Sequence, residues 1–523
     1  MSILRLAVLA ALTTGVVFAG PVEPKKLVPK FKLGKDTTFV MGPLDKDGYI
    51  DYEAALNERL KGKITPETNA VVLLAKCLGP KPEGRELHPD YYKALGIAAP
   101  PEKGEYLVGD SKLFREGPQN TYPEGHQDLQ DHLRQRPWKP EDSPKHAEWL
   151  KLNEKPLAVA VEASKRKDYF HPMIARKKDG SRAMLLNALL PTVQKCRELG
   201  SLLSLRAMLR LGDGRIDDAF ADTLAVHRLG RLVSQGGTLI ELLVGIALQG
   251  IAHADELAVF EHGHPTAKQA LAYQAELRKL PPMATVADKL QLSERVVFLD
   301  IIQTSRREGF DSLSGPEGEG KSKEEIERVA QTIDWELILG LGNGWYDKCE
   351  AAMRKATRAE RVASAGEIVK ALRKMKDKIQ NMSTIEKFLL RVGDVEKIRA
   401  KVSEKIGMTY VSLLIPAFQL VGDAADRAEQ IHRNGLLAAA LAAHFADHQK
   451  YPDKLADLAP KYIGTVPDDI FSAKPLVYMK TDAGYLLYSV GVNGKDDGGK
   501  LISDEPRGDE PRGDDVGVRM PRM

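Results

Sequence analysis

The pattern of hydrophobic and polar positions is helical through the middle of the chain. In residues 185–214, 215–237 and 238–263, apolar side chains recur every three or four positions, and Gly-Asp-Gly and Gly-Gly turns separate the stretches. This spacing predicts three successive amphipathic helices, and the short turns predict that neighbouring helices run antiparallel. The middle of the chain is therefore expected to form an antiparallel helical array.

The N-terminal region has a different pattern, because prolines and glycines interrupt it. Half of the 30 prolines lie between Pro21 and Pro144. Helical spacing is clear at residues 49–62, and a second helix over residues 67–79 follows the start signal Thr65-Pro66. The remainder, from Gly79 to Pro144, predicts extended loops that wrap around another part of the protein.

Charged residues become frequent from about residue 291 to residue 406. The helices expected there carry opposite charges four positions apart, which favours a solvated surface layer; the alternative is a coiled-coil strip that binds a partner. Residues 408–448 predict one long helix with a kink at Pro416. The short strands that follow are expected to pack against its last part, Arg433–Gln449.

The predicted fold is mainly α: an antiparallel helical array with a small α+β C-terminal module, made of a long helix and a short antiparallel sheet. A length of 523 residues suits several folding units. The expected segments are a signal peptide (1–19), a Pro-rich N-terminal region with two helices (20–150), the helical array (151–290), a charged helical region (291–406) and the α+β module with an acidic tail (407–523).

The first 19 residues have the pattern of a secretory signal peptide. Arg5 supplies the positive flank, Leu6 to Phe18 the apolar run, and the small residue Ala19 the cleavage site. We therefore expect a secreted or periplasmic protein cut after Ala19, with an uncleaved signal anchor as the alternative. The residue after the cut is Gly20 rather than cysteine, which argues against a lipid anchor.

Charge and hydropathy indicate whether nucleic acid or a membrane is an expected partner. The chain has 76 basic and 73 acidic residues, and this balance gives no reason to expect nucleic acid. The apolar stretches Leu239–Ala252 and Met408–Val421 are too short or too interrupted to span a bilayer, so core helices are expected, although the second could lie on a membrane surface. No transmembrane span is expected in the mature chain.

The three cysteines are far apart in the sequence, at Cys77, Cys196 and Cys349. An odd number at such spacing is typical neither of a disulfide framework nor of a zinc site. Two alternatives stay open, one bridge with one free thiol or three buried thiols.

Residues 236–244, with the sequence GGTLIELLV, are similar to the cleavage signal of type IV prepilins. In pilins a glutamate lies at the fifth position after the cleaved glycine, where it can pair with the free amine of a neighbouring subunit. Glu241 lies at that position relative to Gly236. The motif lies far inside the chain, however, and its apolar run ends too early to span a bilayer. A buried helix of the array is the preferred interpretation.

Other groups of polar residues have the look of metal sites. Asp45, Asp47 and Asp51 surround Gly48 as in a calcium-binding EF-hand loop, but the register lacks the bidentate glutamate, so an ordinary Asp-Gly turn before a helix is expected. His444 and His448 lie one helical turn apart, and His262 and His264 form another close pair. Neither pair has a third ligand nearby in sequence. Surface or half-buried histidines are expected.

The stretch Tyr451–Gly499 has a specific order of turn and strand signals: a helix ends at Tyr-Pro, an "L..L.P.Y" segment follows, a "P.D.F" turn leads to two strands, and "YS.G..G" runs into an acidic loop. This order resembles the C-terminal half of the major pseudopilin of bacterial type II secretion. The resemblance implies that the acidic loop binds calcium through Asp496, Asp497, Asp514 and Asp515, and oxygen ligands on a loop suit that ion. A solvated acidic turn is the alternative, since a doubled DEPRG insert at 504–513 changes the length of the loop.

Taken with the signal peptide, the opening at residues 48–80 and the helical middle, this C-terminal stretch also resembles a family of large secreted bacterial proteins of unknown function. The resemblance brings no activity with it. The chain also has no nucleophile elbow, phosphate-binding glycine loop or Cys-x-x-Cys motif.

The predicted function is a non-catalytic structural or interaction component of the cell envelope, with a protein partner. The alternative is an extracytoplasmic hydrolase with its site in a groove of the helical array, for which the nearest polar candidates are His227, Asp217, Asp218 and His253. A buried histidine–carboxylate pair facing a pocket would favour the enzyme, whereas an apolar groove without such a pair would favour partner binding.

Overall fold

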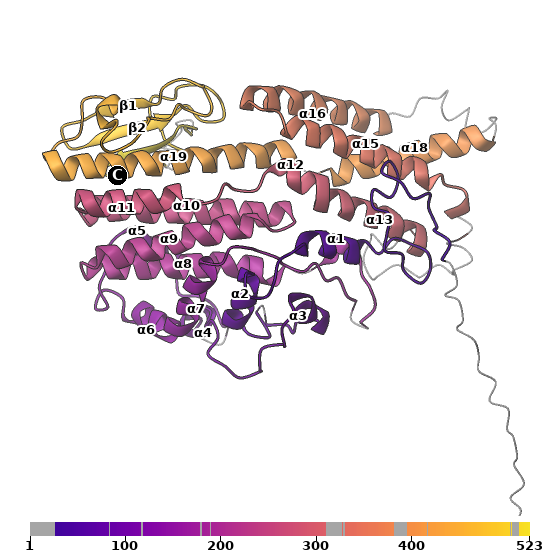
Figure 1. Cartoon of the computed structure of the whole chain (residues 1–523), viewed down its shortest axis with the longest axis horizontal. Helices are drawn as coiled ribbons and strands as arrows, with labels where there is room; N and C mark the ends of the chain where they lie inside the picture. Colours follow the sequence, from indigo (N-terminus) through magenta and orange to yellow (C-terminus); the bar gives the residue numbers. More distant parts are fainter. Residues whose placement is uncertain are drawn as a thin grey trace, which may run out of the picture.

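The computed structural model describes residues 27–82, 84–116, 119–177, 180–188, 190–309, 327, 330–380, 395–415, 417–502, 504 and 512–522. The predicted signal peptide, the proposed kink at Pro416 and most of the doubled DEPRG insert lie outside these residues. Within them the chain is mainly helical and ends in a three-stranded antiparallel sheet, as the sequence predicts (Figure 1).

Both helices predicted in the N-terminal region are present, and each begins at a side chain that caps it. Asp51 accepts a hydrogen bond from the Ala54 amide at 2.9 Å, and Asn69 accepts one from the Val71 amide at 3.1 Å. The helices of this region and the next are α1 (Tyr52–Lys61), α2 (Ala70–Leu78), α3 (Pro89–Leu95), α4 (Ser111–Phe114), α5 (His126–Gln135), α6 (Pro144–Leu152) and α7 (Glu154–Ser164).

The prediction of loops from Gly79 to Pro144 is wrong in part, because α3, α4 and α5 lie there. α3 starts at Pro89, which suits a first helical position, and stops at Gly96 in a left-handed conformation. These helices are short and depend on tertiary contacts: α3 buries Tyr91 and Tyr92, and α5 packs on α8. Short helices of this kind have too few turns to show a clear hydrophobic period.

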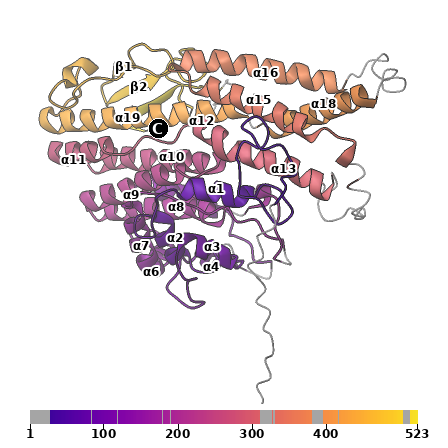
Figure 2. The same ribbon diagram turned by 45° about the vertical axis from the view of Figure 1, so that its right-hand side comes forward.

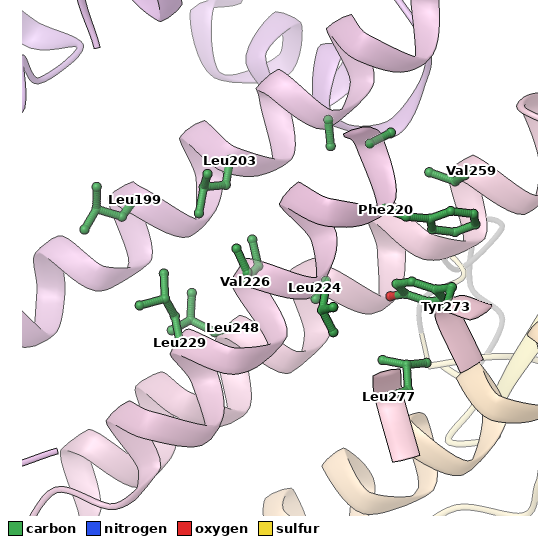
Figure 3. Close-up of a cluster of buried hydrophobic side chains, with 14 of the residues drawn as sticks. Leu199, Leu203, Phe220, Leu224, Val226, Leu229, Leu248, Val259, Tyr273 and Leu277 are labelled. Carbon is green, nitrogen blue, oxygen red and sulfur yellow. The ribbon is translucent and has the colours of Figure 1, made fainter. Parts of the chain in front are cut away.

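The three helices predicted for the array are confirmed as α8 (Pro191–Gly212), α9 (Ile216–Ser234) and α10 (Leu239–His262), and α11 (Ala267–Arg278) follows. Side chains from α8, α9, α10 and α11 interdigitate in one apolar layer, with Leu203, Phe220, Leu248 and Tyr273 among them (Figure 3). The rings of Phe220 and Tyr273 stack with centroids 4.4 Å apart.

The second half of the chain adds α12 (Val286–Lys289), a π-helical turn (Leu290–Glu294), α13 (Arg295–Glu308), α15 (Trp335–Met353), α16 (Arg358–Gln380), α18 (Val395–Leu414) and α19 (Phe418–His448). The single long helix predicted over 408–448 is therefore two helices, since α18 ends at Leu414 and α19 begins at Phe418.

The sheet consists of β1 (Val477–Lys480), β2 (Tyr485–Ser489) and β3 (Val516–Met520), in the order β1-β2-β3. Leu487 of β2 pairs with Tyr478 of β1 and with Val518 of β3. β2 and β3 pack against α19, as predicted, and α10 and α11 contact the same helix, so that α19 lies between the sheet and the array (Figure 1).

Buried apolar side chains form two clusters. The first core joins α2, α5 to α11, the C-terminal half of α19 and the sheet. The second core joins Phe31–Leu56, α13, α15, α16, α18 and the start of α19. The charged region predicted as a surface layer thus contributes to a core that it shares with the N-terminal segment and the start of α10, and its helices α13, α15 and α18 extend away from the sheet (Figures 1 and 2).

Among the residues that the structure describes, two segments are long and apolar enough to cross a membrane by length and composition: Leu239–His262, and Arg399–His448, which takes in most of α18 and all of α19. In the first, which is α10, 67% of the most apolar window is buried inside the protein, and it carries the buried side chains of Glu241, His253, Asp255 and Glu256. Its apolar character is that of a core helix, as the sequence predicts. In the second segment 35% of the window is buried.

Candidate functional site

A groove of about 710 Å³ opens where the turn from α10 to α11, the C-terminal half of α19 and the end of the sheet meet. Its floor includes Ala438 and Ala442 of α19, and its walls include the rings of Phe260, Phe445 and Tyr485. The small alanine side chains of α19 leave room for the groove, and aromatic rings line it. Binding pockets commonly have such a lining.

The aromatic wall of the groove is held by ring contacts. Tyr451, the first residue of the Tyr-Pro junction, lies between Phe445 and Tyr485, with ring centroids 4.8 Å from each. The carboxylates at the rim have partners: Arg522 Nε donates to Glu261 at 2.7 Å, and Lys461 Nζ donates to Asp447 at 2.7 Å. The groove is thus an apolar cleft with a charge-balanced rim.

A buried histidine–carboxylate cluster lies between α9, α10 and α11, where Glu256 accepts three hydrogen bonds. His253 Nδ1 lies 2.6 Å from one carboxylate oxygen; His227 Nε2, at 3.2 Å, and the hydroxyl of Tyr273, at 2.8 Å, contact the other. Burial alone would raise the pKa of Glu256, but these histidine hydrogen bonds and charges outweigh it and lower the pKa to about 2.

The surroundings of Glu256 are equally tight. Gly435 of α19 approaches so closely that an added Cβ would lie 2.2 Å from the carboxylate oxygen. His432, one turn earlier on α19, has its pKa lowered to about 3 by burial and by the nearby Arg231. The cluster is a buried polar network inside the first core in which Glu256 is fully engaged, while His253 Nε2 has no hydrogen-bond partner among the described residues. None of His227, His253 and Glu256 lines the groove.

The structure brings two of the four predicted polar candidates together. His227 and His253 share Glu256, whereas Asp217 and Asp218 lie at the start of α9, where Asp217 accepts from Gln269 and Asp218 pairs with Arg215. Sequence reasoning missed Glu256 itself. The available signal was its position three residues after His253, on the same face of a helix.

The four aspartates of the acidic loop lie close together and accept hydrogen bonds within the loop. Asp515 is fully buried and accepts from the Gly499 amide at 2.8 Å; Asp497 accepts from the Asp514 amide at 2.9 Å. Asp496 accepts from the Gly498 amide at 2.8 Å and from the hydroxyl of Tyr488 at 3.0 Å, and Asp514 accepts from the Asn493 amide at 2.7 Å.

Burial, together with the neighbouring charges of Asp497 and Asp496, raises the pKa of Asp515 against the opposing hydrogen bonds from Gly499 and Asp497. Among the residues that the structure describes, no three His, Cys, Asp or Glu side chains are arranged to hold a metal ion. Carboxylates that already accept from backbone amides offer calcium no ready-made cage. Calcium binding in this loop therefore stays a prediction from the resemblance.

The aspartate of the "P.D.F" turn is Asp469. Its carboxylate accepts from the hydroxyls of Ser472 at 2.7 Å and Ser489 at 2.6 Å, and from the amide of Phe471 at 2.8 Å. Because Ser489 ends β2, Asp469 ties the turn to the sheet.

The smaller motifs take the ordinary forms expected of them. Asp45 accepts from the amides of Asp47 and Tyr49, both at 2.9 Å, in a turn before α1. His444 contacts the Lys450 carbonyl and His448 the Tyr462 hydroxyl. His262 lies 3.6 Å from Glu261, and His264 lines the groove.

The prepilin-like motif forms the start of α10, inside the protein. Thr238 caps the helix by accepting from the Glu241 amide at 3.2 Å, while the Glu241 side chain accepts from the Thr238 amide at 2.9 Å. Glu241, which lies at the position of the pilin glutamate, is therefore part of the capping box that starts α10. The interpretation of the motif as a buried helix of the array is confirmed.

All three cysteines are buried and free. Burial raises the pKa of Cys77 and of Cys349 to about 12 and raises that of Cys196 further. Of the two alternatives, the structure has the three buried thiols.

Comparison with known proteins found no matching protein family, no matching curated protein and no matching solved structure.

Proposed function

We propose that this chain is a non-catalytic structural or interaction component of the cell envelope, and that a protein partner inserts apolar side chains into the groove between α19, the α10–α11 turn and the sheet. The observation that carries the proposal is the chemistry of the groove: aromatic and alanine walls, with rim carboxylates already paired to Lys461 and Arg522. An apolar groove of this kind favours burial of a partner's side chains over acid–base chemistry.

The location in the envelope rests on the sequence. Residues 1–19 have the pattern of a secretory signal peptide, and Tyr451–Gly499 resembles the major pseudopilin module, which belongs to a secretion assembly. The order of elements along this part, α19, then Tyr451-Pro452, a 3-10 turn (Leu455–Leu458) and antiparallel strands, agrees with the order expected of that module. This agreement supports an assembly role.

The test is a photo-crosslinking residue at the groove rim, in place of Gln449, in living cells of the native host. We expect a discrete crosslinked product that disappears when Ala442→Trp fills the groove floor. The matched control is Ala363→Trp on the exposed face of α16, which should leave the product unchanged. Failure to form a product, or a product that Ala442→Trp leaves intact, would contradict partner binding in the groove.

The hydrolase alternative has one observation in its favour, the buried contact of His227 and His253 with Glu256. Ser204 is the side chain of this region whose chemistry best suits a nucleophile, but its hydroxyl donates to Asp255 at 2.5 Å and not to a histidine. If the alternative holds, purified protein should hydrolyse ester, peptide or glycoside substrates, and His253→Ala should abolish that activity while His444→Ala leaves it.

A further inference from the structure

Two leucines beside the joint between α18 and α19 are exposed to solvent. Leu413, near the end of α18, is 73% exposed, and Leu420, in the first turn of α19, is 69% exposed. These are the largest exposed fractions among the large apolar side chains of the described helices. Residues 406–422, which run through the joint, contain no charged residue. Single exposed leucines are common on soluble proteins, whereas two in one uncharged stretch indicate an apolar surface.

The outward side of α18 continues this apolar surface. Val402, which is 37% exposed, precedes Leu413 by eleven positions, about three helical turns, so both lie on the same side of the helix. The opposite side carries Gly407 and Val411, which are buried, and Gly407 lies against Leu341 of α15. Helix α18 therefore packs on α15 through one side and presents a second apolar side to solvent.

Basic side chains flank the exposed side of α18. Arg399 and Lys405 lie three positions before and after Val402, one at each edge of the apolar side. The acidic residues Glu396 and Glu404 lie more than about 100° around the helix from Val402. Helices that lie in the headgroup region of a membrane have this arrangement, because long basic side chains reach lipid phosphates from the edges of the apolar face.

Helix α16 adds further positive charge beside α18. It begins next to α19, where Arg358 pairs with Asp423 at 2.9 Å, and it packs along α18. The last part of α16 exposes three basic side chains and one acidic side chain: Arg373, Lys374, Lys376 and Asp377. Since the chain as a whole has 76 basic and 73 acidic residues, this excess of positive charge is local.

The charge around the apolar side chains decides what kind of partner fits. An apolar surface alone would suit many proteins, whereas one flanked by basic side chains complements a surface that is negative outside and apolar beneath, as an anionic bilayer is. Tyr410, Val411 and Phe418 of the same two helices are buried in the second core. A bilayer would therefore receive the exposed side chains alone, without a membrane span.

We propose that Val402, Leu413 and Leu420, together with the basic side chains of α18 and α16 around them, form a face that binds the surface of an anionic phospholipid bilayer. The leucines enter the headgroup region, and the basic side chains contact lipid phosphates. The groove of the proposed function lies at the other end of α19, where Ala438 is about 27 Å along the helix from Leu420. The two surfaces can therefore act at the same time.

The test places an environment-sensitive fluorophore on Leu413→Cys of the full chain, since the three native cysteines are buried. Vesicles of equal parts phosphatidylcholine and phosphatidylglycerol should shift the emission to the blue, and vesicles of phosphatidylcholine alone should shift it much less. The matched control is the same label on Leu152→Cys, an exposed leucine of α6, which should not respond. No shift at position 413, an equal shift at position 152 or an equal shift with neutral vesicles would overturn the proposal.

Charge variants test the second half of the recognition. In the labelled protein, Lys374→Glu/Lys376→Glu should raise the lipid concentration at half-maximal shift about tenfold or more, because each basic side chain near an anionic surface contributes to binding. The control Lys151→Glu/Lys268→Glu makes the same change of charge at exposed positions of α6 and α11 and should leave that concentration unchanged. Equal effects of the two pairs would contradict a local basic surface.

Two further measurements separate this proposal from its alternatives. Leu413→Gln/Leu420→Gln should leave the thermal unfolding midpoint unchanged without lipid, and a large fall would show that the leucines pack within the chain. A blue shift that grows with protein concentration without vesicles would assign the face to a second copy of the chain. Either result overturns the proposal. The groove variant Ala442→Trp should respond to vesicles as wild type does, so that partner binding in the groove and membrane binding fail independently.

Discussion

Glu256 offers the sharpest test of how the helical array is held together. The carboxylate is buried and accepts hydrogen bonds from His227, His253 and Tyr273, which hold its pKa at about 2, below its ordinary value of 4.5. At about 1.4 kcal/mol for each pKa unit, this difference corresponds to about 3 kcal/mol of folding stability. The replacement Glu256→Gln keeps the volume and removes the charge.

The pH dependence follows from the direction of the shift. Because the pKa of Glu256 is lower in the folded state, its contribution is complete above about pH 4.5 and is lost as the pH falls toward 2. At pH 3 more than half of the contribution should be gone. Wild type and Glu256→Gln should therefore differ by about 3 kcal/mol at pH 7 and approach each other in acid.

The assay is urea unfolding at pH 7, 4 and 3, with Glu276→Gln as the matched control. Glu276 pairs with Arg228 at 2.8 Å and Lys279 at 2.6 Å but is 36% exposed, so its replacement should cost less than about 1 kcal/mol. A Glu256→Gln protein within about 0.5 kcal/mol of wild type at pH 7, or a difference that stays constant down to pH 3, would refute the reasoning.

Gly435→Ala should lower stability by about 1–2 kcal/mol, because the new Cβ displaces Glu256, whereas Gly366→Ala on α16, with open space around it, should gain up to about 1 kcal/mol of helix propensity; denaturant midpoints compare the two. Asp469→Asn should cost about 2 kcal/mol and speed hydrogen exchange in β2, and unchanged exchange would contradict its role in the turn. The resemblance predicts that calcium raises the melting midpoint and that Asp496→Ala/Asp497→Ala abolishes the rise; an unchanged midpoint would make the loop a solvated acidic turn. All three cysteines should resist a thiol reagent until the protein is unfolded, and a fast-reacting native thiol would contradict their burial.

The helical array was predictable because its three long helices show many turns of the same period, with glycine turns between them. The short helices α3 and α5 were not, since their stability comes from packing against residues far away in sequence. The separation of α18 from α19 was missed, because a kinked helix and two separate helices share the same local signal, and the proposed kink at Pro416 lies outside the described residues.

The candidate site was less accessible from the sequence. His227 and His253 were identified as polar residues of the array, whereas Glu256 was not, because a carboxylate on a helix is usually solvated and only packing reveals that it is buried. The groove combines Phe260, Ala442 and Met520, which are separated by up to about 260 positions in the chain. No local pattern brings such residues together.

The length of α19 carries a consequence for how this protein can change over generations. Its 31 residues span about 46 Å as one rigid rod, with Phe418 and Val421 in the second core and Leu437 and Leu441 in the first. Inserting or deleting one residue between these pairs would turn one end by about 100° relative to the other, so that a core would receive the polar face of the helix. Substitutions can accumulate along this stretch, but its number of residues cannot change without displacing one of the two cores. Length variation is therefore expected only in the loops on either side.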